Sequence, residues 1–170
     1  MRIKKLSDRF AAMAGFVGAG ESIADIGSDH AYLPLYLVSE GISPFAVLTD
    51  KAAGPLDKTR TNINMAAVPS LFDLRLGDGL SALLEAEVDT VIIAGLGGET
   101  IISILEADPD KAVSFRKYIL QPRTKTELLD KWLDDAGWEV IAKTTADERG
   151  RRCAIIVCAP NTCVPKEGVT

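Results

Sequence analysis

Short apolar runs alternate with amphipathic segments along most of this chain, and that alternation limits the folds it can adopt. Five runs have the character of buried strands, within residues 22–26, 45–50, 72–79, 88–98 and 117–122. Segments with helical periodicity follow most of them, within residues 31–41, 55–67, 101–105 and 124–137, the last with capping signals at both ends. Strand and helix in alternation predict a mainly parallel sheet covered by helices on both faces.

The two ends of the chain depart from this alternation. Apolar residues three and four apart between Ile3 and Val17 predict an amphipathic N-terminal helix. Residues 138–160 form two apolar runs joined by a charged turn near Asp147–Gly150, which predicts a hairpin. We therefore expect an α/β fold over residues 1–160, with a doubly wound, Rossmann-like sheet and a C-terminal antiparallel hairpin. Residues 161–170 are expected to form a polar tail or the start of a further helical domain.

Composition narrows the class of protein. A chain of 170 residues is the usual size of one domain. It contains no apolar run of about 18 residues and no apolar stretch after its first residues, so we expect a cytoplasmic protein without a membrane segment. Its three cysteines, Cys153, Cys158 and Cys163, lack zinc-site spacing and are expected to be reduced thiols. We expect no bound metal.

The first strand ends in Asp25-Ile26-Gly27-Ser28-Asp29, and ligands of open α/β sheets bind at such ends. Gly27 would let a ligand approach the backbone closely, as any nucleotide site requires. A dinucleotide-binding turn needs glycine where this chain has Asp29, and an acid there would repel a diphosphate. A ligand with an ammonium and a sulfonium cation suits Asp25 and Asp29 better, and S-adenosylmethionine is such a ligand.

The next two strand ends also carry acids. Asp50, followed by Lys51, lies where a carboxylate can accept hydrogen bonds from both ribose hydroxyls. Asp78 could accept from the adenine amino group while the Gly79 N–H donates to the ring. Aspartate next to glycine is also the commonest turn chemistry, so each position alone is ambiguous, and the case depends on three acids at successive strand ends.

Two later turns and a single histidine complete the candidate residues. The loop that contains Gly95, Gly97 and Gly98 would leave space for cofactor and substrate, or would simply be a tight turn. Gln121, before Pro122, offers a donor and an acceptor that could contact a base edge. His30 lies in the first turn, where a catalytic role and a structural role are about equally supported.

The segments ADIGSDHAYLP, GDGL, IAGLGG and ILQP occur in that order, after an opening LSDRFAAMA. With them the chain resembles the bacterial tRNA adenine-22 N1-methyltransferases, a class I S-adenosylmethionine-dependent family, over nearly its whole length. The resemblance implies that Asp25, Gly27, Asp29 and His30 form the first motif. It also implies a ribose site at Asp50, an adenine site at Asp78, and the glycines at 95, 97 and 98 beside the transferred methyl.

The chain departs from that family in two respects. Family members often have Gln-Pro-Asn after the fifth strand, whereas Arg123 follows Pro122 here. Family members also continue into a C-terminal helical domain thought to help grip tRNA, whereas this sequence stops at Thr170. With a net charge of −5, tRNA would have to bind local basic clusters: Arg2, Lys4, Lys5 and Arg9; Arg116, Lys117, Arg123 and Lys125; Arg149, Arg151 and Arg152.

The expected chemistry is methyl transfer to adenine N1, whose lone pair needs alignment and desolvation rather than a strong base. Asp29 is the first candidate for stabilising the positive charge of the product, and His30 or Gln121 could hold the 6-amino group. Two alternatives remain: a methyltransferase of a small molecule or protein, and a noncatalytic module that binds S-adenosylmethionine. A nicotinamide dehydrogenase is disfavoured by Asp29.

Overall fold

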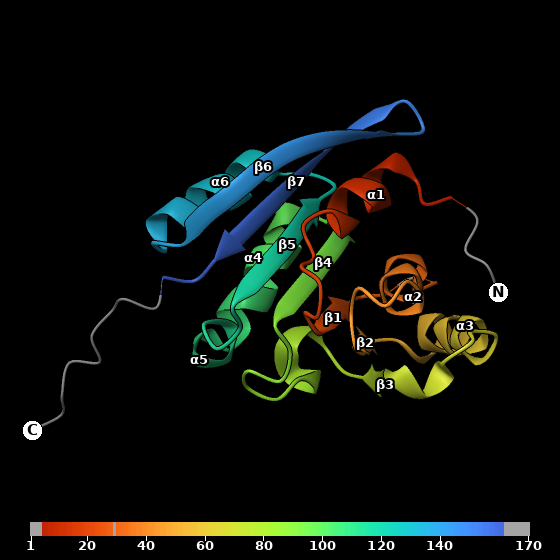
Figure 1. The fold of residues 1–170 in the computed structure, drawn as a ribbon. Coiled ribbons are helices and arrows are strands. Elements are labelled where there is room, and N and C mark those ends of the chain that lie inside the picture. Colours follow the sequence, from red (N-terminus) through yellow and green to blue (C-terminus); the bar gives the residue numbers. More distant parts are fainter. Residues whose placement is uncertain (1–4, 29, 162–170) are drawn as a thin grey trace, which may run out of the picture.

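The computed structural model describes residues 5–28 and 30–161. The strands are β1 (Ile23–Ile26), β2 (Ala46–Asp50), β3 (Phe72–Leu76), β4 (Thr90–Leu96), β5 (Lys117–Pro122), β6 (Glu139–Glu148) and β7 (Arg151–Ala159). The helices are α1 (Asp8–Ala14), α2 (Tyr32–Ser39), α3 (Ala53–Asn64), α4 (Gly98–Ala107), α5 (Pro109–Ala112) and α6 (Thr126–Asp135), with 3-10 turns η1 (Pro69–Leu71) and η2 (Gly79–Ala82) (Figure 1).

All seven strands belong to one sheet in the order β3-β2-β1-β4-β5-β7-β6. Strands β1 to β5 pair in parallel, whereas β7 pairs antiparallel with β5 and with β6. The chain runs outward from β1 to β3 on one side and from β4 to the hairpin on the other. The predicted doubly wound sheet and its C-terminal hairpin are therefore confirmed.

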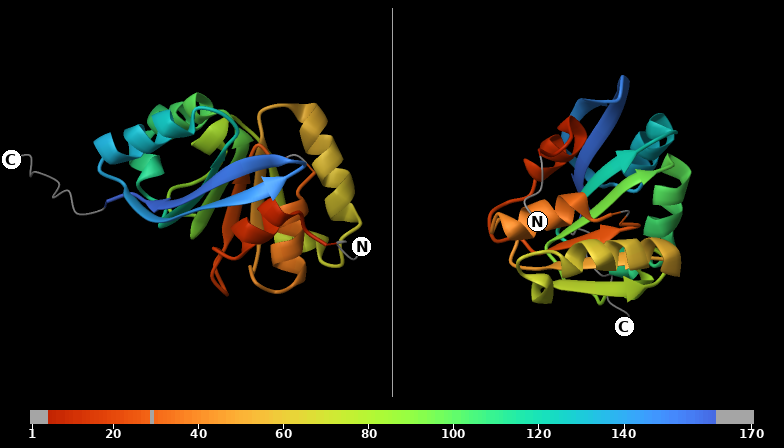
Figure 2. Two further views of the ribbon diagram at one scale, coloured as in Figure 1. Left: turned by 90° about the horizontal axis from the view of Figure 1, so that it is seen from above. Right: turned by 90° about the vertical axis from the view of Figure 1, so that its right-hand side faces the viewer.

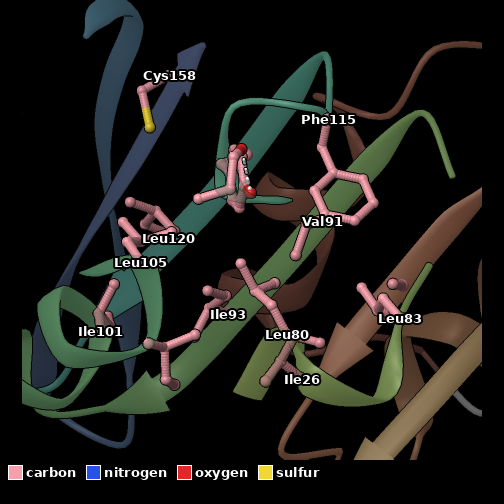
Figure 3. Packing of buried hydrophobic residues seen from close by; sticks show 14 of the residues in the cluster. Ile26, Leu80, Leu83, Val91, Ile93, Ile101, Leu105, Phe115, Leu120 and Cys158 are labelled. Carbon is pink, nitrogen blue, oxygen red and sulfur yellow. Dashed lines mark hydrogen bonds between the residues drawn. The ribbon is translucent and has the colours of Figure 1, made fainter. Parts of the chain in front are cut away.

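Helices cover both faces of this sheet (Figure 2). Successive strand residues point to opposite faces, so in β4 Val91 and Ile93 join one apolar cluster while Ile92 joins the other. The first cluster includes buried residues of α4 and α6, among them Ile101 and Leu105 of α4 (Figure 3). The second packs β1, β4 and β5 against α1 and α2. This two-sided burial explains why the strands appear in the sequence as continuous apolar runs.

Helix α1 begins later than its periodicity predicts. The expected start at Ile3 lies outside the described residues, and residues 5–7 are not helical. Ser7 is the N-cap, because its Oγ accepts a hydrogen bond from the N–H of Phe10 at 3.3 Å. Lys5 and Leu6 therefore lie outside the helix, at the edge of the site described below.

The cap predicted at the start of α6 does not form. Lys125 precedes the helix with a left-handed φ of 58°, and its side chain makes no capping bond. Packing explains the difference, because the Thr124 carbonyl accepts a hydrogen bond from the N–H of Gly98 at 2.8 Å. At the other end the prediction is confirmed: Gly137, with a φ of 71°, follows the C-cap residue Ala136.

The cysteines, membrane segments and metal-binding groups expected or excluded from the sequence can each be examined in the structure. Cys153 and Cys158 are free thiols in β7, as expected, and Cys163 lies outside the described residues, as does the predicted tail from residue 162. No helix in the described ranges has the length and apolar character needed to cross a bilayer. Residues 5–28 and 30–161 hold no group of three His, Cys, Asp or Glu side chains arranged to bind a metal ion.

Candidate active site

A cleft of about 1200 Å³ opens at the carboxyl ends of β1, β4 and β5. Asp25 and Gly27 from β1, Gly95 from β4 and Gln121 from β5 form part of its floor. The segment from Lys5 to Phe10 and the turn of the β6–β7 hairpin form its sides. In the strand order, β1 and β4 are the neighbours from which the chain winds in opposite directions. The cleft therefore lies at the switch point, where ligands of open α/β sheets bind.

Asp25 is a half-buried acid on the floor of this cleft. It lies on β1 between Leu48 of β2 and Ile92 of β4 in the register of the sheet. Burial raises the pKa of its carboxyl to about 6, although the nearby Ser28 hydroxyl and the positive charge of Arg9 oppose the rise. The carboxylate is thus costly to keep ionised, and a cationic ligand would relieve that cost.

The turn after β1 has the backbone that a close ligand approach requires. Gly27 has a φ of 73°, and a Cβ there would meet only Leu96 Cδ1 at 3.9 Å. Helix α3 fixes the turn from the far side, since Thr59 Oγ1 donates to the Ser28 carbonyl at 2.9 Å and Asn62 Nδ2 donates to the His30 carbonyl at 3.0 Å. Sequence reasoning missed these two supports, because their polar side chains resemble an ordinary solvated helix face.

His30 lies in the cleft wall with an unusual backbone. His30 and Ala31 are consecutive left-handed residues, with φ values of 66° and 57°. This conformation costs free energy in residues with a Cβ and tends to mark functional turns. It stacks the His30 ring on Tyr32, with centroids 5.5 Å apart and planes inclined by 16°. Tyr32 is 41% exposed and also lines the cleft, a contribution that the sequence did not suggest.

Gly95 occupies an irregularity in β4. The pairing with β5 shifts register between Ala94 and Leu96, and Gly95 has a φ of 75° there. Its N–H donates to Gln121 Oε1 at 3.1 Å. Gln121 itself is 1% exposed, and its Nε2 donates to the Pro122 carbonyl at 3.0 Å. The amide predicted to contact a base is thus largely engaged in holding the floor of the cleft.

Arg9 connects this floor to the hairpin. Its Nη1 donates to Gln121 Oε1 at 2.7 Å, and an ion pair joins its Nε to Glu148 Oε2 at 2.9 Å. Its side chain is 17% exposed. The sequence placed Arg9 in a basic cluster without a specific role, because its partners lie more than a hundred residues away.

The other predicted cofactor residues follow β2, β3 and β4 outside the lining of the cleft. Asp50 ends β2, half-buried, and its Oδ1 accepts a hydrogen bond from the N–H of Ala52 at 2.8 Å. Asp78 is exposed after β3, and the half-buried Gly79 follows it with a φ of 55°. Lys51 is exposed and Gly97 is half-buried. Asp29 lies outside the described residues.

The three basic clusters separate in the structure. Lys5, Arg9 and Arg123 line the cleft together with three arginines of the hairpin, Arg149, Arg151 and Arg152. By contrast, Arg116 pairs with Asp89 at 3.6 Å and Lys117 with Glu21 at 2.6 Å near the opposite ends of the strands. Arg2 and Lys4 lie outside the described residues. The cleft is therefore lined by basic side chains from three segments that are distant in the sequence, together with the acids Asp147 and Glu148.

Comparison with known proteins agrees with this geometry. The family described as "Methyltransferase domain" matches residues 6–156. The chain belongs to this family. It is 34% identical over 153 residues to the tRNA (adenine(22)-N(1))-methyltransferase of Bacillus subtilis, a match that covers 90% of this chain and 64% of that protein. The resemblance noted in the sequence is thereby confirmed.

Solved structures of this methyltransferase group match the described fold. Sp1610 of Streptococcus pneumoniae, solved in complex with S-adenosyl-L-methionine, is 34% identical, with a TM-score of 0.87 and coverage of 92% of this chain and 73% of that one. TrmK of M. capricolum, in complex with S-adenosyl-homocysteine, is 29% identical, with a TM-score of 0.82 and coverage of 93% of this chain and 70% of that one. The match to the Bacillus protein spans 64% of that protein's length, so this chain corresponds to about two thirds of its relative.

Proposed function

We propose that this methyltransferase domain binds S-adenosylmethionine in its cleft and transfers the methyl group to N1 of an adenine in tRNA, adenine 22 by analogy with the Bacillus relative. The observation that carries the proposal is the half-buried carboxyl of Asp25 at the switch point, flanked by the open glycine turns at Gly27 and Gly95. A tRNA substrate would place the protein in the cytoplasm.

The residues present fit this cofactor better than a phosphate-bearing one. Asp25 presents a carboxylate to the cleft, which suits an ammonium or sulfonium cation and would repel a diphosphate. Asp50 uses one carboxylate oxygen to accept from Ala52, so the other can accept from a ribose hydroxyl. Asp78 and Gly79 follow the next strand and are proposed to contact the adenine, with Lys51 and Gly97 beside the site.

When bound, the cofactor would supply an electrophilic methyl group on a positively charged sulfur. The protein's share of the chemistry is then to align the acceptor nitrogen with that methyl and to exclude water, because adenine N1 needs no strong base. The strained turn at His30 and the exposed ring of Tyr32 would offer the acceptor base an aromatic surface. Gln121 would act mainly by holding Gly95 in place.

A carboxylate is proposed to stabilise the positive charge that the base acquires on methylation. Asp29 keeps the role proposed for it from the sequence, and His30 keeps the role of a hydrogen-bonding partner to the 6-amino group. Both roles suit a first turn that α3 anchors through Thr59 and Asn62. The anchored backbone of His30 would keep its ring in place as charge develops on the base.

Recognition of tRNA is proposed to use the basic residues around the cleft. Arg123, Arg149 and Arg151 are exposed and have no acidic partner in the part of the chain that the structure describes. Such cations would pair with backbone phosphates near the acceptor base and release counterions. The length that the relatives have beyond this domain would supply further tRNA contacts.

Calorimetric titration with S-adenosylmethionine, followed by methyl transfer to unmodified bulk tRNA, tests this function. We expect micromolar or tighter binding of the cofactor, no comparable binding of NAD, and transfer of labelled methyl to RNA. Transfer to a protein or small molecule instead of RNA would replace the proposed substrate. Binding without any transfer would identify a noncatalytic module, and the absence of binding would refute the proposal.

A further inference from the structure

Arg75 lies on β3, at one edge of the sheet (Figure 1), and uses all of its N–H groups within the protein. Its Nε and Nη2 donate to Asp73 Oδ2 at 3.0 and 2.7 Å, and Nη1 donates to the Ala82 carbonyl at 2.9 Å. Nη1 and Nη2 also donate to the two carboxylate oxygens of Glu87, at 2.8 and 2.5 Å. A guanidinium has five N–H donors, so Arg75 joins parts of the chain and has no donor left for a ligand.

The partners of Arg75 lie in the connection from β3 to β4, which also contains Asp78. Ala82 is the last residue of η2, and Glu87 lies in the loop that follows. Glu87 also accepts a hydrogen bond from the N–H of Leu84 at 2.9 Å. The hydrogen bonds from Arg75 hold the pKa of the Glu87 carboxyl below its usual range, so the pair is ionised at neutral pH. Arg75 thus ties β3 to the chain on the far side of the turn that carries Asp78.

This turn is also confined by close contacts with its neighbours. A Cβ on Gly77 would lie 2.6 Å from the Cβ of Ala82, so the two ends of the turn touch. A Cβ on Gly79 would lie 3.1 Å from Ile104 of α4. The backbone around Asp78 is therefore held between α4 on one side and the residues bound by Arg75 on the other.

The Asp78 carboxylate takes no part in holding the turn together. Asp78 occupies the N-cap position of η2, yet its side chain makes no capping bond and is exposed. Its backbone carbonyl instead accepts from Ser81, from Oγ at 2.6 Å and from the N–H at 3.1 Å. The side chain is thus available to a ligand while its backbone is fixed, which is the arrangement that a preorganised contact requires.

We propose that Arg75 is a positioning residue for recognition of the cofactor's adenine, acting through the turn that carries Asp78 and Gly79. The inference rests on the proposed function, in which Asp78 accepts from the 6-amino group and the Gly79 N–H donates to the ring. A turn without its anchor would have to be ordered when the ligand binds, and that ordering weakens affinity. Because Arg75 does not touch the ligand, its loss should affect the ligand groups that the turn contacts.

Titration with two ligands tests the proposal: S-adenosylhomocysteine, and its analogue with hydrogen in place of the 6-amino group. The analogue keeps the ring nitrogens and loses the donor to Asp78. Wild type should bind S-adenosylhomocysteine about 10-fold more tightly than the analogue. Arg75→Met should weaken S-adenosylhomocysteine by about 10-fold and the analogue by less than about 3-fold. Arg75→Lys, which keeps the charge without the fork, should weaken S-adenosylhomocysteine by only about 3-fold.

Lys117→Met is the matched control. Like Arg75, Lys117 is a partly buried cation that binds a glutamate, Glu21 at 2.6 Å, and a backbone carbonyl, that of Phe16 at 2.7 Å. It lies near the opposite ends of the strands, so both ligands should bind this variant within about 2-fold of wild type. Urea denaturation compares the stability of the two variants, and Glu87→Gln provides a milder change to the same anchor. We expect Glu87→Gln to weaken S-adenosylhomocysteine by about 3-fold, with a smaller effect on the analogue.

An equal loss of both ligands in Arg75→Met, or no loss in either Arg75→Met or Glu87→Gln, would overturn the proposal. The same selective loss in Lys117→Met would also overturn it, because the effect would then follow from lowered stability alone. Wild type that binds both ligands equally would remove the adenine contact and the proposal with it. Wild type that binds neither ligand would overturn the proposed function itself.

Discussion

Asp25 shows how a single residue can oppose folding in order to serve binding. Its pKa is raised to about 6 by burial, so near neutral pH the fold holds an ionised carboxylate in a poorly hydrated position. A side chain selected only for stability would not be charged there.

The cofactor affinity should depend on pH through Asp25. Protonation below pH about 6 removes the negative charge that attracts the ligand's cations. We therefore predict that the Kd for S-adenosylmethionine rises toward tenfold per pH unit below that value and is flat from pH 7 to 8. Calorimetry across this range measures it, with Asp25→Asn expected to bind weakly at every pH. Equal affinity of wild type at pH 5 and pH 7.5 would exclude this role.

Removing the same charge should stabilise the ligand-free fold. A carboxyl whose pKa is higher in the folded state makes folding most favourable at low pH, and this advantage is lost as the pH rises through about 6. Asp25→Asn should therefore unfold at the same free energy as wild type near pH 4. At pH 7 the variant should be more stable by about 2 kcal/mol. Urea denaturation at both pH values measures the difference, and a variant less stable than wild type at pH 7 would contradict the assignment.

Among the elements, α4 and the loop before α6 meet at a contact that admits no side chain. A Cβ on Gly98 would lie 2.4 Å from the Lys125 carbonyl oxygen and 2.9 Å from that of Thr124. Gly98→Ala should therefore lower the free energy of unfolding by about 1–3 kcal/mol, since both obstacles are backbone atoms.

A second glycine provides the control for this contact. Gly54, in the first turn of α3, has open space around the position of a Cβ. Gly54→Ala should raise the free energy of unfolding by about 0.5 kcal/mol, because alanine loses less conformational entropy in a helix. Thermal or chemical denaturation compares the two variants. Equal effects of both substitutions would mean that α4 can move away from the loop.

The hairpin carries the prediction about RNA. Arg149, Arg151 and Arg152 lie along one side of the cleft, and replacing all three with glutamine should weaken tRNA binding. The logarithm of the tRNA association constant should depend less steeply on the logarithm of the salt concentration. The magnitude of that slope should fall by about 2, because each of three lost phosphate contacts contributes about 0.7–0.9. Arg116→Gln, near the opposite end of β5, should leave the slope unchanged. Filter binding at several salt concentrations measures both, and an unchanged slope in the triple variant would remove the hairpin from the interface.

The strands could be predicted from the sequence to within a few residues, because parallel strands buried on both faces appear as apolar runs. Helix starts were harder, since Ser7 and Lys125 mark boundaries set by local hydrogen bonding and by packing. The cleft floor was predicted in part, at Asp25, Gly27, Gly95 and Gln121. Each of these residues follows or ends an apolar run, the position where a sheet presents its ligand-binding edge.

The residues around the floor could not be predicted, for a topological reason. Arg9 contacts Gln121 across 112 positions of the sequence, and Glu148 joins the same group from the hairpin. Nothing local to any of these residues indicates the contact, because it depends on α1 packing beside β6. The interactions that shape the cleft therefore join segments far apart in the sequence.

The molecule as a whole combines a rigid sheet with a cleft of mixed charge. Asp25 lies on the floor and Arg9 bonds to Gln121 of that floor, whereas Arg123 and the hairpin arginines lie at the edges. This separation suits a small zwitterionic cofactor held deep in the cleft and a polyanion across its mouth. A net charge of −5 does not conflict with RNA binding when the cations are gathered in this way.

The most direct test of this account is methyl transfer to two unmodified tRNA transcripts that differ only at position 22. Labelled S-adenosylmethionine, the domain and each transcript are incubated, and the methylated nucleoside is identified by mass spectrometry. The account predicts N1-methyladenosine in the transcript with adenine 22 and none in the transcript with guanine 22. Equal methylation of both transcripts, or cofactor binding with no methylated RNA from either, would contradict it.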